Sequence, residues 1–592
     1  MLERGTLVPD PTTYSWTPTS SDTIYCAWLG ELLLHAVWRM AGWDGLFVLR
    51  YLLAFGCVAL VLRHARASGL RSGPAVVAIV TIAMLATAPV MRNLKPEMLS
   101  VALTWCVLGL YAEARRLDLA GRPSALRWWA VPLVLLAWVN THGGFLIVAP
   151  VLATILVGEA LNRVAGGETA LSREAMRHLV GAWLASAAAV VATPYGTAYP
   201  RQLVDEYLLG RGTTPQGAYA WNDAYRSVGF GAADTMHLGE LSVAMAAILI
   251  ALHVRVAGSS WRRIDFAAVL APLAAGALYF WYLRTTFVLP AVFAFAAIGL
   301  LARDRGSIGP FVDRPDLAWA ATVLVVLLGG RAVLDARGPV GRAGFAGLGF
   351  SHDVPVAEAD WIARHALPRD LYNTFDSGGY LLWRLHPKHR VMVDPRAFPF
   401  NAWFDDHADF ASGRDVEGFI AKYPAHAAMI DLEKAGTWIG FARSPDWRPV
   451  FYGPTAVVFV RRDAAAGTGH TDATPEPAAT LDRLRNGHVA LRAFEFARFV
   501  DDHDTAWRLL DQLDGPLRDR TDRLLRRSLD GRAASERERT MLTLLAALAR
   551  LDGGQDDPRA RLVAQGLQRV LPTPSGRPVP GDASAVAPPV VH

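Results

Sequence analysis

The sequence predicts a polytopic α-helical membrane domain of about ten spans, followed by a small extracytoplasmic α/β domain and a short helical C-terminal region. Two observations lead to this fold class. Hydrophobic residues make up 52% of the 592 residues, which excludes a disordered chain. The long apolar runs are also confined to the chain before Leu334, and an ordinary soluble composition follows.

The membrane domain is expected over residues 46–334. A bilayer core about 30 Å thick needs roughly 20 apolar residues per helix, and fewer where terminal arginines reach the surface. The apolar runs that meet this requirement are 46–62, 73–91, 98–112, 128–141, 144–161, 179–194, 240–255, 265–281, 286–302 and 317–334.

The charges between these runs indicate the orientation. If the connections alternate between the two sides, one side receives 16 arginines and the other receives 6 arginines and lysines. The positive-inside rule makes the first side cytoplasmic. Residues 1–45, the loop 195–239 and everything after Leu334 are therefore expected to lie outside. Because residues 1–45 have no signal-peptide pattern, either this tail crosses with its first helix or a leading span precedes it.

The N-terminal segment contains the first candidate site. A helix is expected over Ile24–Ala41, and Glu31, His35 and Arg39 are spaced four apart along it, so they share one face. With its aromatic residues, such a helix suits the outer membrane surface. The shared face is either a solvated ion-paired face or an acid/base site at the rim of a cavity. Glu31 and Asp22, which precedes the helix, are the candidate catalytic carboxylates.

Three outer turns supply candidate substrate-binding residues. Arg92 and Lys95, in MRNLKPE, either anchor the helix ends or hold the phosphate of a lipid-linked substrate. His142, in VNTHGGF, either contacts a polar headgroup or acceptor or belongs to a helix cap. Arg284, in YLRTTF, either reaches the membrane surface or lines a cavity.

The α/β domain is expected over residues 350–462. Its pattern of strands and helices is typical of a mostly buried sheet. The strands are expected at 390–394, 427–431, 449–452 and 456–461, and the helices at 354–366, 416–423 and 433–441. Ligands of such sheets bind beyond the carboxyl ends of the strands, where Asp394 and Arg396 lie, and where Asp376 follows an earlier strand.

The remainder of the chain divides by composition. Residues 464–479 are rich in Ala, Gly, Thr and Pro, which favours a linker. Residues 480–571 carry leucines at helical spacing and weakly resemble tetratricopeptide hairpins, without a convincing repeat. Residues 572–592 are expected to be disordered.

Several functional classes are excluded. The sequence has no Walker A loop, HExxH pair, GxSxG elbow with a plausible triad order or CxxC pair, so we predict no metal site from spacing. Its three cysteines provide no disulfide framework. The net charge of +5 lies mostly in short turns between apolar runs, which argues against a nucleic-acid partner and for membrane lipid.

Seven segments resemble, in order, a bacterial family of large membrane proteins related to the GT-C glycosyltransferases. This superfamily contains the protein mannosyltransferases, aminoarabinose transferases and oligosaccharyltransferases. The segments are PDPTTYSWT (9–17), AWLGELLLHAVWRMAGWDGLFVLR (27–50), KPEMLS (95–100), VNTHGGF (139–145), TPYG (193–196), YNTFDSGGYLLWRL (372–385) and HRVMVDPRAF (389–398). The resemblance covers residues 1–462, and its most specific part is the last pair.

The resemblance implies a GT-C-like fold in the bacterial inner membrane, and an enzyme that moves a sugar from a polyprenyl-phosphate donor to an envelope protein or glycan acceptor outside. In that family a carboxylate just after the first membrane helix acts as general base or positions a divalent metal, and cations hold the donor phosphate. The chain departs from the pattern: Thr12 stands where relatives carry Asp, Cys26-Ala27 where they carry His-Glu, and the acidic motif would precede residue 1. A non-enzymatic envelope scaffold that presents its outer domains to partners is therefore the alternative.

Overall fold

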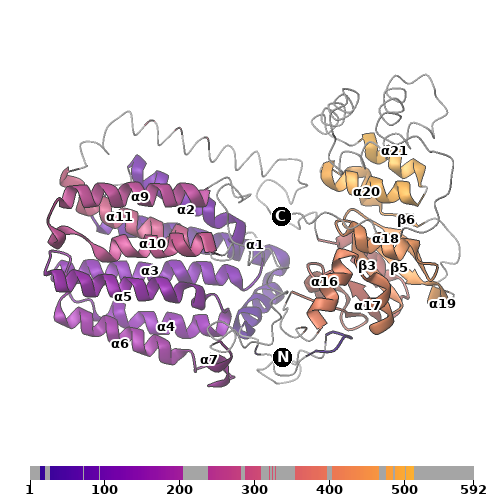
Figure 1. Cartoon of the computed structure of the whole chain (residues 1–592), viewed down its shortest axis with the longest axis horizontal. Helices are drawn as coiled ribbons and strands as arrows, with labels where there is room; N and C mark the ends of the chain where they lie inside the picture. The colour runs from indigo at the N-terminus through magenta and orange to yellow at the C-terminus, as the bar shows by residue number, and fades with distance from the viewer. Residues whose placement is uncertain are drawn as a thin grey trace, which may run out of the picture. The chain divides into compact units, whose positions relative to one another are not determined.

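A computed structural model describes residues 14–19, 24, 27–70, 73–91, 94–203, 238–281, 287–307, 319, 323, 327, 354–395, 400, 403–465, 475–484, 487–500 and 502–511. The chain divides into two compact units, Met1–Ala478 and Ala479–His592. The first unit contains long apolar helices and a mixed sheet (Figure 1).

The first unit begins with a bundle of helices that lie side by side (Figure 1). They are α1 (Trp28–Ala67), α2 (Pro74–Met91), α3 (Glu97–Leu119), α4 (Ala125–Thr141), α5 (Phe145–Ala165), α6 (Arg173–Ala189), α7 (Ala198–Leu203), α9 (Leu238–Ala257), the 3₁₀ turn η4 (Trp261–Arg263), α10 (Phe266–Trp281) and α11 (Val288–Arg303). Four of the described helices, α1, α3, α5 and α9, are long and apolar enough to cross a membrane. Shorter apolar helices occupy α2, α10 and α11. The chain is therefore a membrane protein, as its composition predicts.

The predicted spans overlap these helices, with one exception. The predicted span 317–334 lies outside the described residues except at positions 319, 323 and 327. The predicted span 179–194 is shifted, since α6 begins at Arg173 and ends at Ala189. The reason is a helix cap: the Ser172 hydroxyl accepts a hydrogen bond from the Ala175 N–H at 3.0 Å.

A break divides α1. The backbone leaves the helical region at Ala41 and at Gly42, where φ is 59°. Glycine enters this left-handed region without the steric cost that a Cβ atom imposes. The sequence predicts a helix end at Gly42, and the backbone does turn there, although helical structure resumes at once and reaches Ala67.

Contacts between turns bring the arginine-rich connections to one end of the bundle, which we call the inner end. Arg305 Nη1 donates to the Gly69 carbonyl at 2.7 Å, and Arg303 Nη2 donates to the Arg263 carbonyl at 3.1 Å. The Ser172 hydroxyl donates to Asp118 Oδ1 at 2.6 Å. These contacts join turns that the alternating topology assigns to a single side.

The bundle interior is packed with large apolar side chains, including Trp105, Trp138 and Phe293, all 0% exposed. Gly158 lets α5 and α10 approach closely, because a Cβ atom there would lie 2.4 Å from Ala267 Cα. Small residues at such crossings are typical of helices that pack in membranes.

The α/β part follows the bundle. Its elements are α14 (Val356–Arg364), β1 (Asp370–Asn373), α15 (Gly378–Leu385), β2 (Arg390–Val391), α16 (Phe404–Ser412), α17 (Val416–Lys422), β3 (Ala427–Asp431), α18 (Ala435–Arg443), β4 (Trp447–Tyr452), β5 (Ala456–Arg461), α19 (Arg462–Ala465) and β6 (Glu476–Pro477). The sheet has the order β2-β1-β3-β5-β4-β6. Strands β1, β2 and β3 are mutually parallel where they pair, whereas β5 runs antiparallel to both its neighbours.

The expected combination of apolar helices with a small, mostly buried sheet is confirmed, and β3 is buried along its whole length. Strand β2 is shorter than the predicted 390–394. The Asn373 side chain replaces backbone pairing there, accepting from the Met392 N–H at 2.7 Å and donating to the Val393 carbonyl at 2.8 Å. Glu476 and Pro477 lie in the segment predicted as a linker, yet they pair with β4.

The N-terminal residues 14–19 join the edge of this sheet. Ser15 forms a parallel bridge with Val391, and its hydroxyl donates to the Met392 carbonyl at 2.8 Å. Trp16 Nε1 donates to the Leu371 carbonyl at 3.1 Å, and its ring meets Tyr372 edge-on at 5.3 Å. The first resemblance segment thus contacts the last two, although more than 350 residues separate them in sequence.

The second unit, described by itself, contains η7 (Ala479–Arg483), α20 (Gly487–Phe499) and α21 (His503–Asp511). Arg508 Nη1 on α21 donates to Asp482 Oδ1 on η7 at 2.7 Å. The predicted disordered tail 572–592 lies outside the described residues.

Candidate functional site

Three resemblance segments meet at Gly30, at the end of the bundle opposite the inner end. A Cβ atom on Gly30 would lie 2.4 Å from the Thr141 carbonyl oxygen and 2.9 Å from Pro96 Cβ. The start of α1, the turn before α3 and the end of α4 therefore touch at a position that admits only glycine without movement. We call this contact of Gly30, Pro96 and Thr141 the outer junction.

Hydrogen bonds reinforce the outer junction. Trp28 Nε1 on α1 donates to Asn140 Oδ1 on α4 at 3.0 Å. The Asn140 amide donates in turn to the Ala192 carbonyl at 3.0 Å, just before the TPYG segment. The ring of Tyr199, on α7, meets Phe145 at 6.2 Å. The residues on either side of the TPYG segment, Ala192 and Tyr199, are thus attached to the same end of the bundle.

His142 is held by a network that fixes its tautomer. The Gly144 N–H donates to His142 Nδ1 at 3.0 Å, so Nδ1 is an acceptor and the neutral ring carries its proton on Nε2. The Ser100 hydroxyl lies 2.7 Å from Nδ1 and accepts from Trp138 Nε1 at 2.7 Å, which leaves its own proton for His142. This arrangement orients the ring at the end of α4.

Each described candidate of the membrane part is a direct chain neighbour of an outer-junction residue. Glu31 follows Gly30, Lys95 precedes Pro96, and His142 follows Thr141. Glu31 and Lys95 are exposed, whereas His142 is half-buried. The structure therefore brings together the three segments that carry these residues, which the sequence offered as separate sites. Asp22, Arg92, Arg284 and Arg396 lie outside the described residues.

The chemistry available at the outer junction follows from these types of residue. An exposed ammonium group near the membrane surface suits a phosphate, a carboxylate can accept a proton, and an oriented imidazole can do either or hold a polar group. Within the described part of the chain, no three His, Cys, Asp or Glu side chains are arranged to hold a metal ion.

The second predicted location is the carboxyl edge of β1, β2 and β3. Asp394 is 2% exposed there, and Gly378 packs so closely that its Cβ atom would lie 2.8 Å from Asp394 Cα. Asp376 lies on the same edge and is exposed. The start of α15 covers Asp394, which therefore belongs to the interior of the domain.

Asp431, which the sequence did not single out, ends β3 at the same edge. Its carboxylate accepts hydrogen bonds from the Thr374 hydroxyl and from Ser377 Oγ, the latter at 2.8 Å. Burial raises the pKa of Asp431 to about 6. These contacts tie the ends of β1 and β3 to α15 and explain why the TFDS segment has hydroxyl residues.

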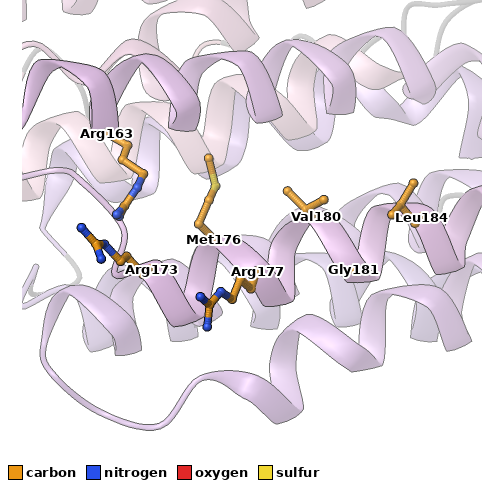
Figure 2. Close-up of a pocket in the computed structure, with 7 residues that line it drawn as sticks. All are labelled: Arg163, Arg173, Met176, Arg177, Val180, Gly181 and Leu184. Atoms are coloured by element: carbon orange, nitrogen blue, oxygen red, sulfur yellow. The ribbon is translucent and has the colours of Figure 1, made fainter.

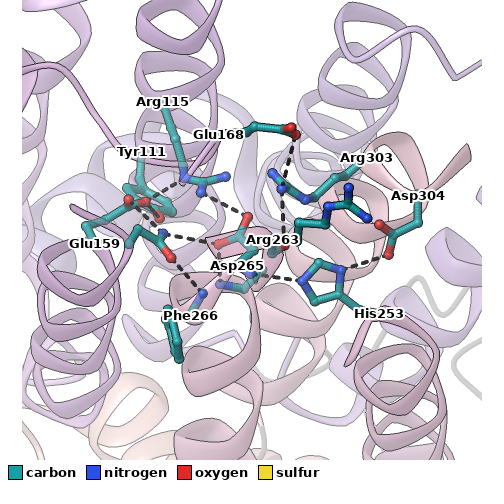
Figure 3. A network of polar contacts seen from close by, with 12 residues as sticks. Tyr111, Arg115, Glu159, Glu168, His253, Arg263, Asp265, Phe266, Arg303 and Asp304 are labelled. Carbon is teal, nitrogen blue, oxygen red and sulfur yellow. Dashed lines mark hydrogen bonds and ion pairs between the residues drawn. The ribbon is translucent and has the colours of Figure 1, made fainter. Parts of the chain in front are cut away.

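A network of buried polar contacts lies at the inner end (Figure 3). Arg115 donates to Glu159 at 2.5 Å and pairs with Asp265 at 2.9 Å. The Asp265 N–H donates to His253 Nε2 at 2.9 Å, so the proton of the neutral ring lies on Nδ1. His253 Nδ1 lies 2.8 Å from Asp304 Oδ2 and donates to it. These buried groups connect α3, α5, α9, α10 and the end of α11.

Sequence reasoning missed this network. Its signal was present in Glu159, near the end of the predicted span 144–161, and in Asp265, at the start of 265–281. A carboxylate at the edge of an apolar run requires a cation or hydrogen-bond donor. Arg115 provides both, from another helix. Because each charge is compensated inside the protein, the network stabilises the bundle and offers no open site.

No protein-family model matches this chain, and no curated protein matches it. Among solved structures, the oligosaccharyltransferase of Archaeoglobus fulgidus with a tethered acceptor peptide is similar at 12% identity and a TM-score of 0.39, over 71% of this chain and 62% of that one. ArnT from Cupriavidus metallidurans, in the apo state, is similar at 16% identity and a TM-score of 0.41, over 77% and 89%. The archaeal AglB in complex with an inhibitory peptide and a dolichol-phosphate is similar at 13% identity and a TM-score of 0.36, over 72% and 63%.

The chain thus spans 62% of the length of the first of these neighbours. The neighbours are GT-C membrane glycosyltransferases, the superfamily that the motifs of this chain resemble. What this chain does is argued below from its own residues.

Proposed function

We propose that the chain is an integral membrane glycosyltransferase that moves a sugar from a polyprenyl-phosphate-linked donor to an envelope protein or glycan acceptor, on the extracytoplasmic face. The observation that carries this proposal is the outer junction. Three separate segments that resemble GT-C motifs contact one another there, and Glu31, Lys95 and His142 are direct chain neighbours of the residues in contact.

Each residue has a distinct role in this proposal. Lys95, with Arg92 beside it, binds the donor phosphate, because an interfacial cation next to water is a natural anion site. Glu31 or Asp22 accepts the proton of the acceptor hydroxyl or amide as it attacks the sugar. His142 and Arg284 contact the polar parts of the substrate, as does Arg396 of the α/β domain, whereas the buried Asp394 has no direct role in binding. No step of the proposal runs through a metal ion.

Contacts within the first unit support a common side of the membrane for the start of the chain and the α/β domain. Trp383 of α15 meets the rings of Trp38 and Trp43 on α1 edge-on, at 6.0 Å and 4.8 Å. Because residues 14–19 also contact the α/β domain, the start of the chain and residues 354–465 must lie on one side of the membrane. An even number of crossings must separate them. The proposal places both outside a bacterial inner membrane, by the positive-inside rule.

The test is a transfer assay in membranes that contain or lack the chain, with radiolabelled polyprenyl-phosphate sugars as donors. Lys95→Gln should reduce transfer by about 10-fold to 100-fold, since a hydrogen bond to a charged group contributes about 1.5–3 kcal/mol. Lys388→Gln, an exposed lysine of the α/β domain, is the matched control and should transfer normally.

Two outcomes would contradict the proposal. Equal transfer by Lys95→Gln and wild type would remove the phosphate-binding role of Lys95. No transfer by the wild type, from any polyprenyl-phosphate donor, would favour the non-enzymatic scaffold, in which the membrane part anchors the α/β and helical parts for envelope partners.

A further inference from the structure

A pocket of about 540 Å³ lies beside α6, near the inner end of the bundle, outside the outer junction and the buried network. Its lining combines two kinds of residue, as Figure 2 shows. The lining consists of Arg163, Arg173, Met176, Arg177, Val180, Gly181 and Leu184.

The charged end of the pocket has three arginines. Arg163 Nη1 donates to the Leu171 carbonyl at 2.8 Å, which fixes its guanidinium at the turn between α5 and α6. Arg173 and Arg177 are exposed, one turn apart on α6. Within the described part of the chain, neither of these two arginines pairs with a carboxylate.

The nearby carboxylates have other partners. Glu168 pairs with Arg303 at 3.7 Å, and Glu174 lies 3.6 Å from His178. Asp118 accepts from the N–H and the hydroxyl of Ser172. Within the described part of the chain, none of these carboxylates pairs with a guanidinium group of the pocket, so the three arginines can bind an anion.

The other end of the pocket is apolar. Val180 and Leu184 follow the arginines along α6 and project to the same side as Met176 in Figure 2. Leu184 is 68% exposed, so the apolar row is uncovered. At 1.5 Å per residue, Arg173 and Leu184 are about 16 Å apart along the helix axis. A charged group followed by an apolar row of this length matches a phospholipid headgroup and the upper part of its acyl chain.

We propose that this pocket binds an anionic phospholipid, with the phosphate held by Arg163, Arg173 and Arg177 and an acyl chain along Met176, Val180 and Leu184. The positive-inside topology assigns the pocket to the cytoplasmic leaflet, where anionic lipids meet basic pockets between helices. Free phosphate would use the arginines but gain nothing from the apolar row, so the occupant is a lipid.

The experiment is native mass spectrometry of the purified full chain in detergent, titrated with dioleoyl phosphatidylglycerol and, separately, with dioleoyl phosphatidylcholine. The wild type should retain phosphatidylglycerol more strongly than phosphatidylcholine. Since one cation near an anionic headgroup corresponds to about 5-fold in affinity, the Arg173→Gln/Arg177→Gln variant should bind it roughly 25-fold more weakly. Arg66→Gln/Arg122→Gln, which removes the same charge from exposed positions of other inner-end turns, should bind it as the wild type does.

A second variant separates the lipid from its phosphate. Leu184→Gln keeps all three arginines and should weaken phosphatidylglycerol binding, and it remains testable if the arginine variant does not fold. Excess inorganic phosphate should leave the lipid bound. Equal binding by the arginine variant and its charge-matched control would overturn the proposal, as would displacement of the lipid by inorganic phosphate or unchanged binding by Leu184→Gln.

Discussion

Because of the outer junction, Gly30→Ala should lower the free energy of unfolding, although it adds only one methyl group. The added Cβ atom would lie 2.4 Å from the Thr141 carbonyl oxygen, whereas ordinary contacts begin at 3.4 Å, so α1 and the end of α4 must separate by about 1 Å. The Thr141 carbonyl oxygen belongs to the backbone and cannot rotate away. Forcing one carbon into a packed contact of this kind costs about 1–3 kcal/mol.

The measurement is the free energy of unfolding in mild detergent titrated with sodium dodecyl sulfate, followed by tryptophan fluorescence. Gly56→Ala, on the same helix, is the control because nothing lies within 4 Å of its added Cβ atom. It should be neutral or should stabilise by up to about 1 kcal/mol, through the better helix propensity of alanine. Equal free energies for the two variants would show that α1 and α4 do not touch at Gly30.

Three further predictions concern other contacts. Ser100→Ala should lower the free energy of unfolding by about 1–3 kcal/mol, because it removes the acceptor of the buried Trp138 indole N–H. Thr154→Ala is the control, since it removes an exposed hydroxyl that bonds within its own helix, and it should lower the free energy of unfolding little in the same titration. Equal losses in the two variants would count against the Ser100 network. Burial raises the pKa of Glu358 from 4.5 to about 7, so its ionisation opposes folding: stability should fall by about 3 kcal/mol as pH rises from 4.5 through 7. Glu358→Gln should remove that part of the pH dependence in thermal unfolding of the full chain. An unchanged pH profile would show that ionisation of Glu358 does not cause the loss of stability. Trp16→Ala should speed hydrogen exchange of the Val391 amide, which donates to the Tyr14 carbonyl at 3.3 Å. Trp16→Phe keeps the ring contact with Tyr372, so the Val391 amide should exchange more slowly in this variant than in Trp16→Ala. Identical exchange in both variants would contradict the docking of residues 14–19.

Regular elements were predictable from the sequence because their signals are local. Strands at 427–431 and 456–461 have the bounds expected from their apolar runs. Strand β2 was overestimated because its end depends on Asn373, a side chain 19 residues away that takes the Met392 N–H. Strand β6 was missed since Glu476 and Pro477 form it only by pairing with β4.

The candidate site shows the same limit. Glu31, Lys95 and His142 could each be selected by charge and position, but nothing local indicates that their segments touch. That information lies in Gly30, whose missing side chain matters only once α4 is packed against it. The Glu159, Arg115 and Asp265 cluster was missed for a related reason, because partners from three helices compensate one another only in the folded bundle.

The most direct test of the account is photocrosslinking of the purified chain with a polyprenyl phosphate that carries a photoreactive group next to its phosphate. If the outer junction binds the donor, crosslinked peptides should come from segments 27–33, 94–100 and 139–145, and excess unlabelled polyprenyl phosphate should suppress them. Crosslinks that fall elsewhere in the bundle, or that persist unchanged in excess unlabelled lipid, would show that the outer junction is not a donor site.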